Sequence, residues 1–275
     1  MNTVTEKAYA KVNLTLGVLY KRPDGYHALD SLMQTVDLYD TVTMEKSTGI
    51  TVTVSGAVLP YKNTLRTAAE AFYGETGLGA SIHVNKRIPS EAGMGGGSAD
   101  GAAVLRGLNR LYDYPLPAYL LPRLALKVGA DVPFLLRGGL QRAQGVGEIL
   151  TPLPYERFYL VLAKPAAGVS TKALFTSLKL PLPRPDTLAA AKAIAAGDGK
   201  ALAPLLFNAM EEAAVSVLPE IGSLKRTLLS LGALNAVMTG SGSTVFGLFA
   251  TEEEAETAAA YLKGLVPFVH VCRTV

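Results

Sequence analysis

The sequence is poor in the residues that form covalent and metal cross-links. Of its 275 residues only one is a cysteine, Cys272, and three are histidines, while tryptophan is absent. A single cysteine excludes a disulfide within the chain, and a reducing compartment is the natural setting for such a protein. No grouping of histidine, cysteine and aspartate has the spacing of a metal site, so metal ligands stay unknown at this stage.

Concentrated charge of one sign is also missing. The formal net charge is +3, and basic residues occur in no run longer than a pair. Proteins that bind DNA or RNA carry clustered basic residues, so this composition argues against a nucleic-acid partner. A mild positive balance is compatible with an anionic small-molecule substrate. Nothing in the composition indicates an oligomeric state.

Long apolar runs are few. The segment Gly232–Ala250 is uncharged over 19 residues, which approaches the length of a membrane-spanning helix. Asn235 and the glycines at 240 and 242 interrupt it, and residues typical of strands flank the glycines, so we predict a strand, a turn and a strand. The N-terminal segment lacks the apolar core of a signal peptide. We therefore expect a soluble, cytoplasmic protein without a membrane partner.

Hydrophobic periodicity predicts strands and helices in both halves of the chain, and hence an α/β (α+β) fold. The proline-rich segment Thr151–Pro154 is our candidate boundary between an N-terminal domain, 1–153, and a C-terminal domain, 154–275. We expect strands at Tyr9–Leu19, Gln34–Met44, Ile50–Val54, Ser81–Lys86, Asp131–Leu136, Gly139–Gln144, Phe158–Ala163, Val237–Gly240, Val245–Leu248 and Phe268–Val271. We expect helices at Asn63–Tyr73, Ser98–Tyr112, Leu116–Val128, Lys172–Leu178, Leu188–Ala196, Ala201–Val215, Glu220–Leu231 and Glu252–Leu262.

The most informative passage is the glycine-rich segment Pro89–Gly97, which lies between a predicted strand and a predicted helix. Converging backbone N–H groups and the positive end of a helix bind phosphate, and glycine permits the close approach. Ser98 at the helix start has a hydroxyl that can cap the helix or reach a phosphate or Mg²⁺. The segment lacks the Walker A lysine and does not complete the dinucleotide-binding fingerprint. It predicts a phosphate site of another type, with a merely flexible surface loop as the alternative.

Three segments resemble the motifs of the GHMP kinases, the superfamily of galactokinase, homoserine kinase and mevalonate kinase. PSEAGMGGGSAD, which begins at Pro89, resembles the second motif, AYAKVNLTLGV at Ala8–Val18 the first, and MTGSGSTVFGLF at Met238–Phe249 the third. The resemblance implies an ATP- and Mg²⁺-dependent phosphotransferase with an alcohol acceptor. It also implies an N-terminal domain like ribosomal protein S5 domain 2 and a ferredoxin-like C-terminal domain. The nucleotide site that it implies consists of Pro89, Ser90, Glu91, Ala92, Gly93, Met94, Gly95, Gly96, Gly97, Ser98, Ala99, Asn63 and Lys86.

The resemblance also implies a catalytic pair, Lys11 and Asp131. In the family the matching aspartate acts as general base, and the matching lysine orients the acceptor hydroxyl and supports the developing charge. Phosphoryl transfer needs these functions because the acceptor must lose a proton while charge moves onto the leaving group. Asp131 enters an apolar stretch, where reduced solvation suits a base. Taken in isolation, Lys11 would be a solvated strand residue and Asp131 a turn or helix cap.

Further segments, such as KRPDGYHALDSL at Lys21–Leu32, resemble one branch of this family whose acceptor carries cytidine diphosphate. By this resemblance Tyr26 and Phe175 enclose the cytosine ring, and His27 binds its polar edge. Asn13 lies two residues beyond the catalytic lysine, hence on the same strand face, and reaches the other end of the acceptor. The implied substrate residues are Asn13, Tyr26, His27, Thr171, Phe175, Gly240 and Ser241.

Two other functions remain open from the sequence. One is a related kinase with a different small acceptor, such as homoserine or mevalonate, against which the DGYH segment argues. The other is a nucleotide-binding regulator without catalytic activity. The presence of Lys11, Asp131 and Ser98 argues against that second alternative.

Overall fold

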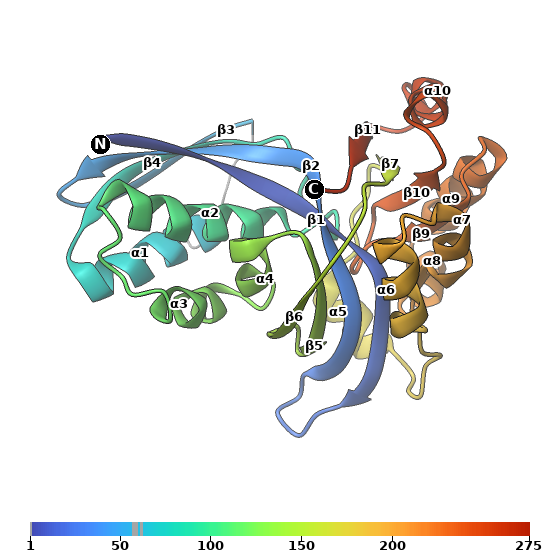
Figure 1. Ribbon diagram of the computed structural model, residues 1–275, viewed down its shortest axis with the longest axis horizontal. Coiled ribbons are helices and arrows are strands. Elements are labelled where there is room, and N and C mark those ends of the chain that lie inside the picture. Colours follow the sequence, from blue (N-terminus) through green and yellow to red (C-terminus); the bar gives the residue numbers. More distant parts are fainter. Residues whose placement is uncertain (1, 57–59, 61–62) are drawn as a thin grey trace. The chain divides into compact units, whose positions relative to one another are not determined.

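A computed structural model describes residues 2–56, 60 and 63–275, which form two units interleaved along the chain (Figure 1). Strands β1 (Thr3–Lys21) and β2 (His27–Ser47) contribute residues to both units. The predicted domains are contiguous, and their boundary near residue 153 stays a prediction. The first unit contains Met1–Ala10, Leu38–Ile88 and Gly95–Gly138, and the second contains Lys11–Asp37, Pro89–Met94 and Gly139–Val275.

The first unit is a sheet with helices along one face. Strand β3 (Ile50–Ser55) pairs in parallel with β4 (Gly79–Asn85), which pairs antiparallel with β2, and β1 follows. Alternate residues of β4 are buried, as expected of a strand with one covered face. The helices on that face are α1 (Thr64–Thr76), α2 (Gly96–Leu111), α3 (Leu120–Val128) and α4 (Val132–Arg137) (Figure 1).

Helix α2 forms the centre of this unit. Most of its residues are buried, among them Ala99, Ala102 and Ala103, and small side chains let it approach its neighbours closely. A Cβ added at Gly107 would overlap the side chain of Met44 in β2. This close packing fixes the position of α2, whose first residues are the last glycines of the glycine loop.

The second unit contains a four-stranded antiparallel sheet in the order β11-β7-β10-β9. Its strands are β7 (Tyr159–Lys164), β9 (Asn235–Met238), β10 (Val245–Phe249) and β11 (Phe268–Arg273). Helices α9 (Glu220–Ser230) and α10 (Glu252–Leu262) pack on this sheet through a shared apolar core. Along the chain the elements follow in the order strand, helix, two strands, helix and strand, which is the ferredoxin-like topology. The prediction of a ferredoxin-like C-terminal domain is confirmed.

The other elements of this unit are of two kinds. Some are strands that pair beside β1 and β2, and the others are helices that connect β7 to α9. Strand β5 (Leu140–Gly145) pairs antiparallel with β2 and with β6 (Ile149–Leu153). The short β8 (Phe207–Asn208) pairs in parallel with β1, with Phe207 opposite Thr15. The connecting helices are α5 (Thr171–Ser177), α6 (Thr187–Ala195), α7 (Gly199–Leu202), the 3₁₀ turn Ala203–Leu205 and α8 (Glu211–Val217).

The prediction of a strand at Asp131–Leu136 is wrong. The segment forms helix α4, which begins directly after Asp131. Pro133 stands in the first turn, where the missing N–H is unpaired in any helix and the fixed φ favours helix formation. The helix carries the backbone of the predicted catalytic aspartate at its N-cap.

Two other predictions of local structure are wrong. Ala201–Val215 is not one helix, because α7, a 3₁₀ turn containing Pro204, strand β8 and α8 follow one another there. Thr151–Pro154 is largely strand β6 rather than an irregular joint. In the described part of the chain β6 pairs only with β5, and such an edge strand tolerates Pro152.

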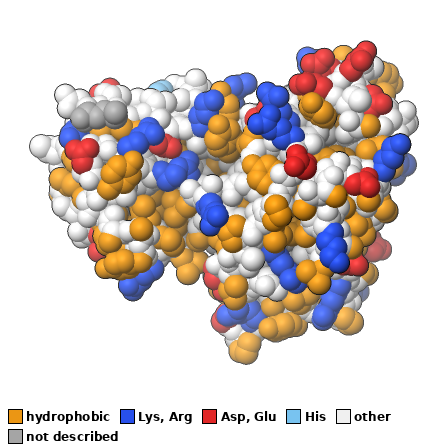
Figure 2. All heavy atoms as spheres, viewed as in Figure 1, with side chains coloured by type: hydrophobic (Ala, Val, Ile, Leu, Met, Phe, Trp, Pro, Cys, Tyr) orange, Lys and Arg blue, Asp and Glu red, His pale blue; other side chains and the backbone are white. Residues whose placement is uncertain are grey.

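The uncharged window Gly232–Ala250 forms β9, a glycine turn and β10, as predicted. None of the helices in the described ranges has the length and apolar character needed to cross a membrane. Figure 2 shows basic side chains spread among apolar ones over the face drawn. Acidic side chains gather there over α10, whose first turn contains Glu252, Glu253 and Glu254.

Candidate active site

The first half of the glycine loop, Pro89–Met94, lies against the turn of the third motif within the second unit. The backbone N–H of Ser243 donates to the carbonyl oxygen of Glu91 at 3.4 Å, and that of Thr244 to the carbonyl oxygen of Ala92 at 3.3 Å. Two segments about 150 residues apart are therefore joined by backbone hydrogen bonds.

Glycine is required where these two turns touch. Gly93 and Gly240 have φ values of +70° and +55°, which favour glycine. A Cβ at Gly93 would overlap the carbonyl oxygen of Thr239, and a Cβ at Gly240 would lie 2.6 Å from the carbonyl oxygen of Gly93. Neither turn can carry a side chain at these positions without a backbone shift.

Side chains fix the third-motif turn from two sides. The buried Asn208 of β8 donates from Nδ2 to the carbonyl oxygens of Met238 at 2.7 Å and Gly240 at 2.8 Å. The hydroxyls of Ser241 and Thr171 share a hydrogen bond of 2.6 Å. The structure thus brings together three predicted substrate residues, Gly240, Ser241 and Thr171, and adds Asn208, which the sequence analysis missed.

Lys11 and Asn13 form a buried polar network beside the glycine loop. Lys11 is only 4% exposed, and its Nζ donates to Asn13 Oδ1 at 2.5 Å. The backbone N–H of Lys11 donates to the Met94 carbonyl oxygen at 3.0 Å. Asn13 donates from Nδ2 to Ser31 Oγ at 2.8 Å and from its backbone to Thr239 Oγ1 at 2.9 Å. Lys11 is therefore a buried, oriented ammonium group and not a solvated strand residue.

The predicted acceptor wall contains a stacked pair of rings. The rings of His27 and Phe175 lie 5.2 Å apart between centroids and are inclined by 27°. Burial, with the nearby charge of Lys21, lowers the pKa of His27, so the imidazole is neutral at pH 7. Tyr26 is 66% exposed, which leaves its ring accessible. Enclosure of a cytosine by Tyr26 and Phe175 stays a prediction, because His27 covers one face of Phe175.

The second half of the glycine loop opens helix α2 in the first unit. Gly95 is the N-cap with φ +70°, and within the described residues no side chain caps the helix. A Cβ at Gly96 would lie 2.9 Å from Ile88, and one at Gly97 would lie 3.1 Å from Thr64 Oγ1. The first N–H groups of a helix have no partner within it and attract anions. This uncapped, glycine-lined helix start can accept an anionic group such as a phosphate.

Ser98 and Asp131 lie on neighbouring elements of the first unit. A Cβ at Gly129, two residues before Asp131, would lie 3.9 Å from Ser98 Oγ. Asp131 is the N-cap residue of α4, although in the described chain its side chain makes no capping hydrogen bond to that helix. Lys11 belongs to the other unit, so the catalytic pairing of Lys11 with Asp131 stays a prediction.

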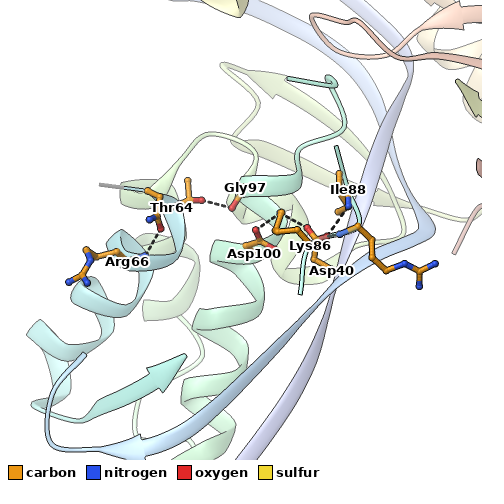
Figure 3. Close-up of polar contacts among 9 residues, drawn as sticks. Asp40, Thr64, Arg66, Lys86, Ile88, Gly97 and Asp100 are labelled. Atoms are coloured by element: carbon orange, nitrogen blue, oxygen red, sulfur yellow. Dashed lines mark hydrogen bonds and ion pairs between the residues drawn. The ribbon is translucent and has the colours of Figure 1, made fainter. Parts of the chain in front are cut away.

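A buried cluster of one lysine and two aspartates lies beneath the start of α2 (Figure 3). Lys86 Nζ donates to Asp40 Oδ2 and, at 2.6 Å, to Asp100 Oδ2. Asp40 Oδ1 also accepts from the backbone N–H groups of Arg87 at 2.5 Å and Ile88 at 2.8 Å. Asp100 Oδ1 is buried without a hydrogen-bond partner among the described atoms. The Lys86 side chain thus points at two carboxylates, and its place in the nucleotide site stays a prediction.

The electrostatics of this cluster favour a proton on Asp100. Burial, together with the charge of Asp40, raises the pKa of Asp100 to about 7, although Lys86 acts against this rise. Asp40 accepts three hydrogen bonds, whereas Asp100 accepts one from Lys86. Burial alone would lower the pKa of Lys86, but Asp100 and Asp40 outweigh it and raise that pKa.

This cluster predicts a pH-dependent stability. Between the ordinary pKa of 3.8 and about 7, folded Asp100 keeps a proton that the unfolded chain releases. The free energy of unfolding should therefore fall as the pH rises through this window, by at most about 1.4 kcal/mol per pH unit from this group. The measurement is urea unfolding across the window for the wild type and Asp100→Asn, because the amide does not titrate. Equal pH slopes in the two proteins would contradict the assignment.

Asn63 begins helix α1. Its Oδ1 accepts from the backbone N–H of Arg66 at 3.1 Å, and its Nδ2 donates to the Pro60 carbonyl oxygen at 2.7 Å. Asn63 is thus the N-cap of α1, a role for which asparagine is favoured. The place of Asn63 in the nucleotide site stays a prediction.

Two family models match the chain. The model of the GHMP kinases N terminal domain matches residues 63–139, and that of the GHMP kinases C terminal domain matches 190–266, on either side of the predicted boundary. A protein from Desulfitobacterium hafniense (strain Y51) is 42% identical over 94% of this chain and 91% of its own length. A protein from Caldicellulosiruptor saccharolyticus is 44% identical over 94% of this chain and 92% of its own length. Both carry the name 4-diphosphocytidyl-2-C-methyl-D-erythritol kinase.

Solved structures agree with these matches. A crystal structure of a 4-(cytidine 5'-diphospho)-2C-methyl-D-erythritol kinase superposes with a TM-score of 0.86 at 33% identity, covering 98% of this chain and 99% of its own. The homoserine kinase from Cytophaga hutchinsonii superposes with a TM-score of 0.79 at 21% identity, covering 100% of this chain and 95% of its own. The second likeness shows a shared fold.

Proposed function

The chain belongs to the GHMP kinases, in the family of the 4-diphosphocytidyl-2-C-methyl-D-erythritol kinases, and we propose that it phosphorylates this cytidylated alcohol with ATP. The acceptor is the 2-hydroxyl group, and the step belongs to the non-mevalonate route to isoprenoid precursors. One observation carries the proposal. Two glycine turns interlock beside the buried Lys11, in a chain that matches kinases of this one acceptor over more than nine-tenths of its length.

The glycine loop and the start of α2 supply the proposed binding site for the phosphates of ATP. Its backbone N–H groups and the helix dipole favour anions there, and Ser98 adds a hydroxyl. No group of three or more His, Cys, Asp or Glu in the described ranges is arranged to hold a metal ion. We propose that Mg²⁺ is held mainly by the phosphates, where it would neutralise the charge that develops during transfer.

Lys11 and Asp131 carry the proposed chemistry. As the acceptor oxygen bonds to the γ-phosphorus, the bond from that phosphorus to the bridging oxygen of ADP breaks, and Asp131 takes the hydroxyl proton. The Lys11 ammonium orients the acceptor oxygen and offsets the negative charge that accumulates. Asn13 supports this role because its amide holds Lys11 Nζ and is itself held by Ser31.

The acceptor wall consists of His27, Phe175 and the hydroxyls of Thr171 and Ser241. A neutral imidazole offers one donor and one acceptor, which suits the polar edge of cytosine. The aromatic faces of Tyr26 and Phe175 suit its ring. Cytidine should therefore compete with the acceptor, which it would not do for a homoserine or mevalonate kinase.

A coupled ADP-release assay tests the proposal. We expect turnover with ATP, Mg²⁺ and 4-diphosphocytidyl-2-C-methyl-D-erythritol, and no turnover with homoserine or mevalonate. Cytidine should inhibit the reaction. Turnover with another acceptor would preserve the roles of Lys11, Asp131 and the glycine loop but discard those of Tyr26, His27 and Phe175. Binding of ATP without turnover on any acceptor would favour a nucleotide-binding regulator.

A further inference from the structure

A buried lysine ends strand β7. The side chain of Lys164 is in the core of the second unit with 7% exposure, and its Nζ donates to the carbonyl oxygens of Pro165 at 3.1 Å, Ala166 at 3.5 Å and Ala167 at 3.4 Å. Within the described residues these hydrogen bonds go only to backbone carbonyls and not to a carboxylate. Burial lowers the pKa of this ammonium, although the charge of Glu91 acts against the shift. A buried lysine without a bonded carboxylate is uncommon and calls for an explanation.

The three carbonyl oxygens belong to successive residues and converge on one point. Carbonyl dipoles that point together repel one another unless a cation lies between them, which is why such turns bind metal cations or ammonium groups. Here the cation is attached to the chain itself. A hydrophobic side chain of the same size would fill the space but would leave the three oxygens buried and unpaired.

The segment 165–168 connects the glycine loop, the third motif and the acceptor wall. The Ala167 carbonyl oxygen also accepts from Ser243 Oγ at 2.6 Å. A Cβ at Gly168 would lie 2.5 Å from the carboxylate of Glu91, so the segment touches the glycine loop as well. It then leads into Ser170, the N-cap of α5.

Helix α5 carries the residues that the proposed acceptor site depends on. Thr171 bonds to Ser241, and Phe175 stacks on His27. A change in the path of segment 165–168 would move both contacts, because the helix follows directly from it. The same helix borders an open hollow at the surface, lined by Ser170, Lys172, Ala173, Thr176 and Ser177.

We propose that Lys164 is a positioning residue that takes the place of a bound monovalent cation, and that it holds segment 165–168 in the path that the acceptor site requires. The choice of acceptor in the test below rests on the proposed function. The role of Lys164 in holding segment 165–168 does not depend on it. It assigns Lys164 no contact with the reacting atoms.

Chemical rescue tests this role. Lys164→Ala should raise KM for the cytidylated acceptor by about tenfold or more, because three hydrogen bonds to a charged donor are lost, while KM for ATP changes by less than about threefold. Ammonium ions at about 0.1 M should enter the vacated space and restore part of the affinity. Tetramethylammonium at the same concentration controls for ionic strength and is too large to enter.

Two further variants make the test specific. Lys164→Met fills the space without a charge, so it should show the same defect without rescue. Lys192→Met removes an exposed lysine of α6 and should behave as the wild type. Unchanged KM values in both Lys164 variants would overturn the proposal. An equal rise in KM for ATP and for the acceptor, without rescue by ammonium, would also overturn the proposal, since that pattern indicates general destabilisation.

Hydrogen–deuterium exchange separates this proposal from the proposed function. In Lys164→Ala the amides of 166–171 should exchange faster than in the wild type, and ammonium should slow them again. This result would support the loop-holding role even if no acceptor were turned over by the wild type. Exchange that is unaffected by both the substitution and ammonium would overturn the role whatever the substrate.

Discussion

Replacing Asp131 by asparagine is expected to lower kcat by about 10³-fold or more while KM for ATP stays within about threefold of the wild type. The amide has nearly the shape of the carboxylate but does not take up the hydroxyl proton of the acceptor. Folding should be preserved, because the substitution changes neither the size of the side chain nor the backbone of α4. Steady-state ADP release and a thermal melt measure the two quantities on the same preparation.

A second aspartate of the same unit provides the matched control. Asp113 is exposed in a turn and has φ +56°, a conformation that asparagine accepts readily. Asp113→Asn should therefore retain full activity and stability. Near-normal turnover by Asp131→Asn would contradict the general-base role and leave Lys11 as the main catalytic group.

Adding one methyl group at Gly93 is expected to disable the enzyme by a different route. The new Cβ would overlap the Thr239 carbonyl oxygen and lie 3.0 Å from the backbone N and O of Gly242, at a φ of +70°. Because these nearest neighbours are backbone atoms, they cannot move aside cheaply, and Gly93→Ala should lose about 2 kcal/mol or more of stability. Turnover should fall by about 100-fold or more, because the two turns that are proposed to face the phosphates separate. Urea unfolding and ADP release are the measurements.

Gly74→Ala is the control for the glycine loop. Gly74 lies in helix α1, and a Cβ there would meet no described heavy atom within 4 Å. Alanine should stabilise the helix by up to about 1 kcal/mol without changing the kinetics. Wild-type turnover by Gly93→Ala would show that the interlocked turns are not needed for phosphate transfer.

The amino-acid sequence by itself was enough to predict those features that depend on local rules. The glycine loop between a strand and helix α2 follows from the backbone freedom of glycine and the unpaired N–H groups at a helix start. The ferredoxin-like sheet follows from the resemblance and from apolar, strand-like segments such as Phe158–Ala163. The prediction of a strand at Asp131–Leu136 was wrong because a short apolar run has the same pattern in a buried strand and in a helix.

Other features depend on partners that are far away in the chain. Strand β8 exists because Phe207 and Asn208 pair with β1, and this pairing interrupts the helix predicted over Ala201–Val215. No local pattern announces such a partner, so propensity alone favours the helix.

The tertiary structure also decided the polar networks and their charge states. Asn13 meets a residue 226 positions away, and Lys86 meets Asp40 across 46 positions. The pKa of Asp100 depends on burial and on these neighbours, neither of which is written in the residues around it. The burial of Lys164 also depends on the fold, although the three carbonyls that its ammonium contacts belong to the next three residues. Long-range contacts decide these properties because a charge responds to its whole surroundings, whereas a turn responds mainly to its own φ and ψ.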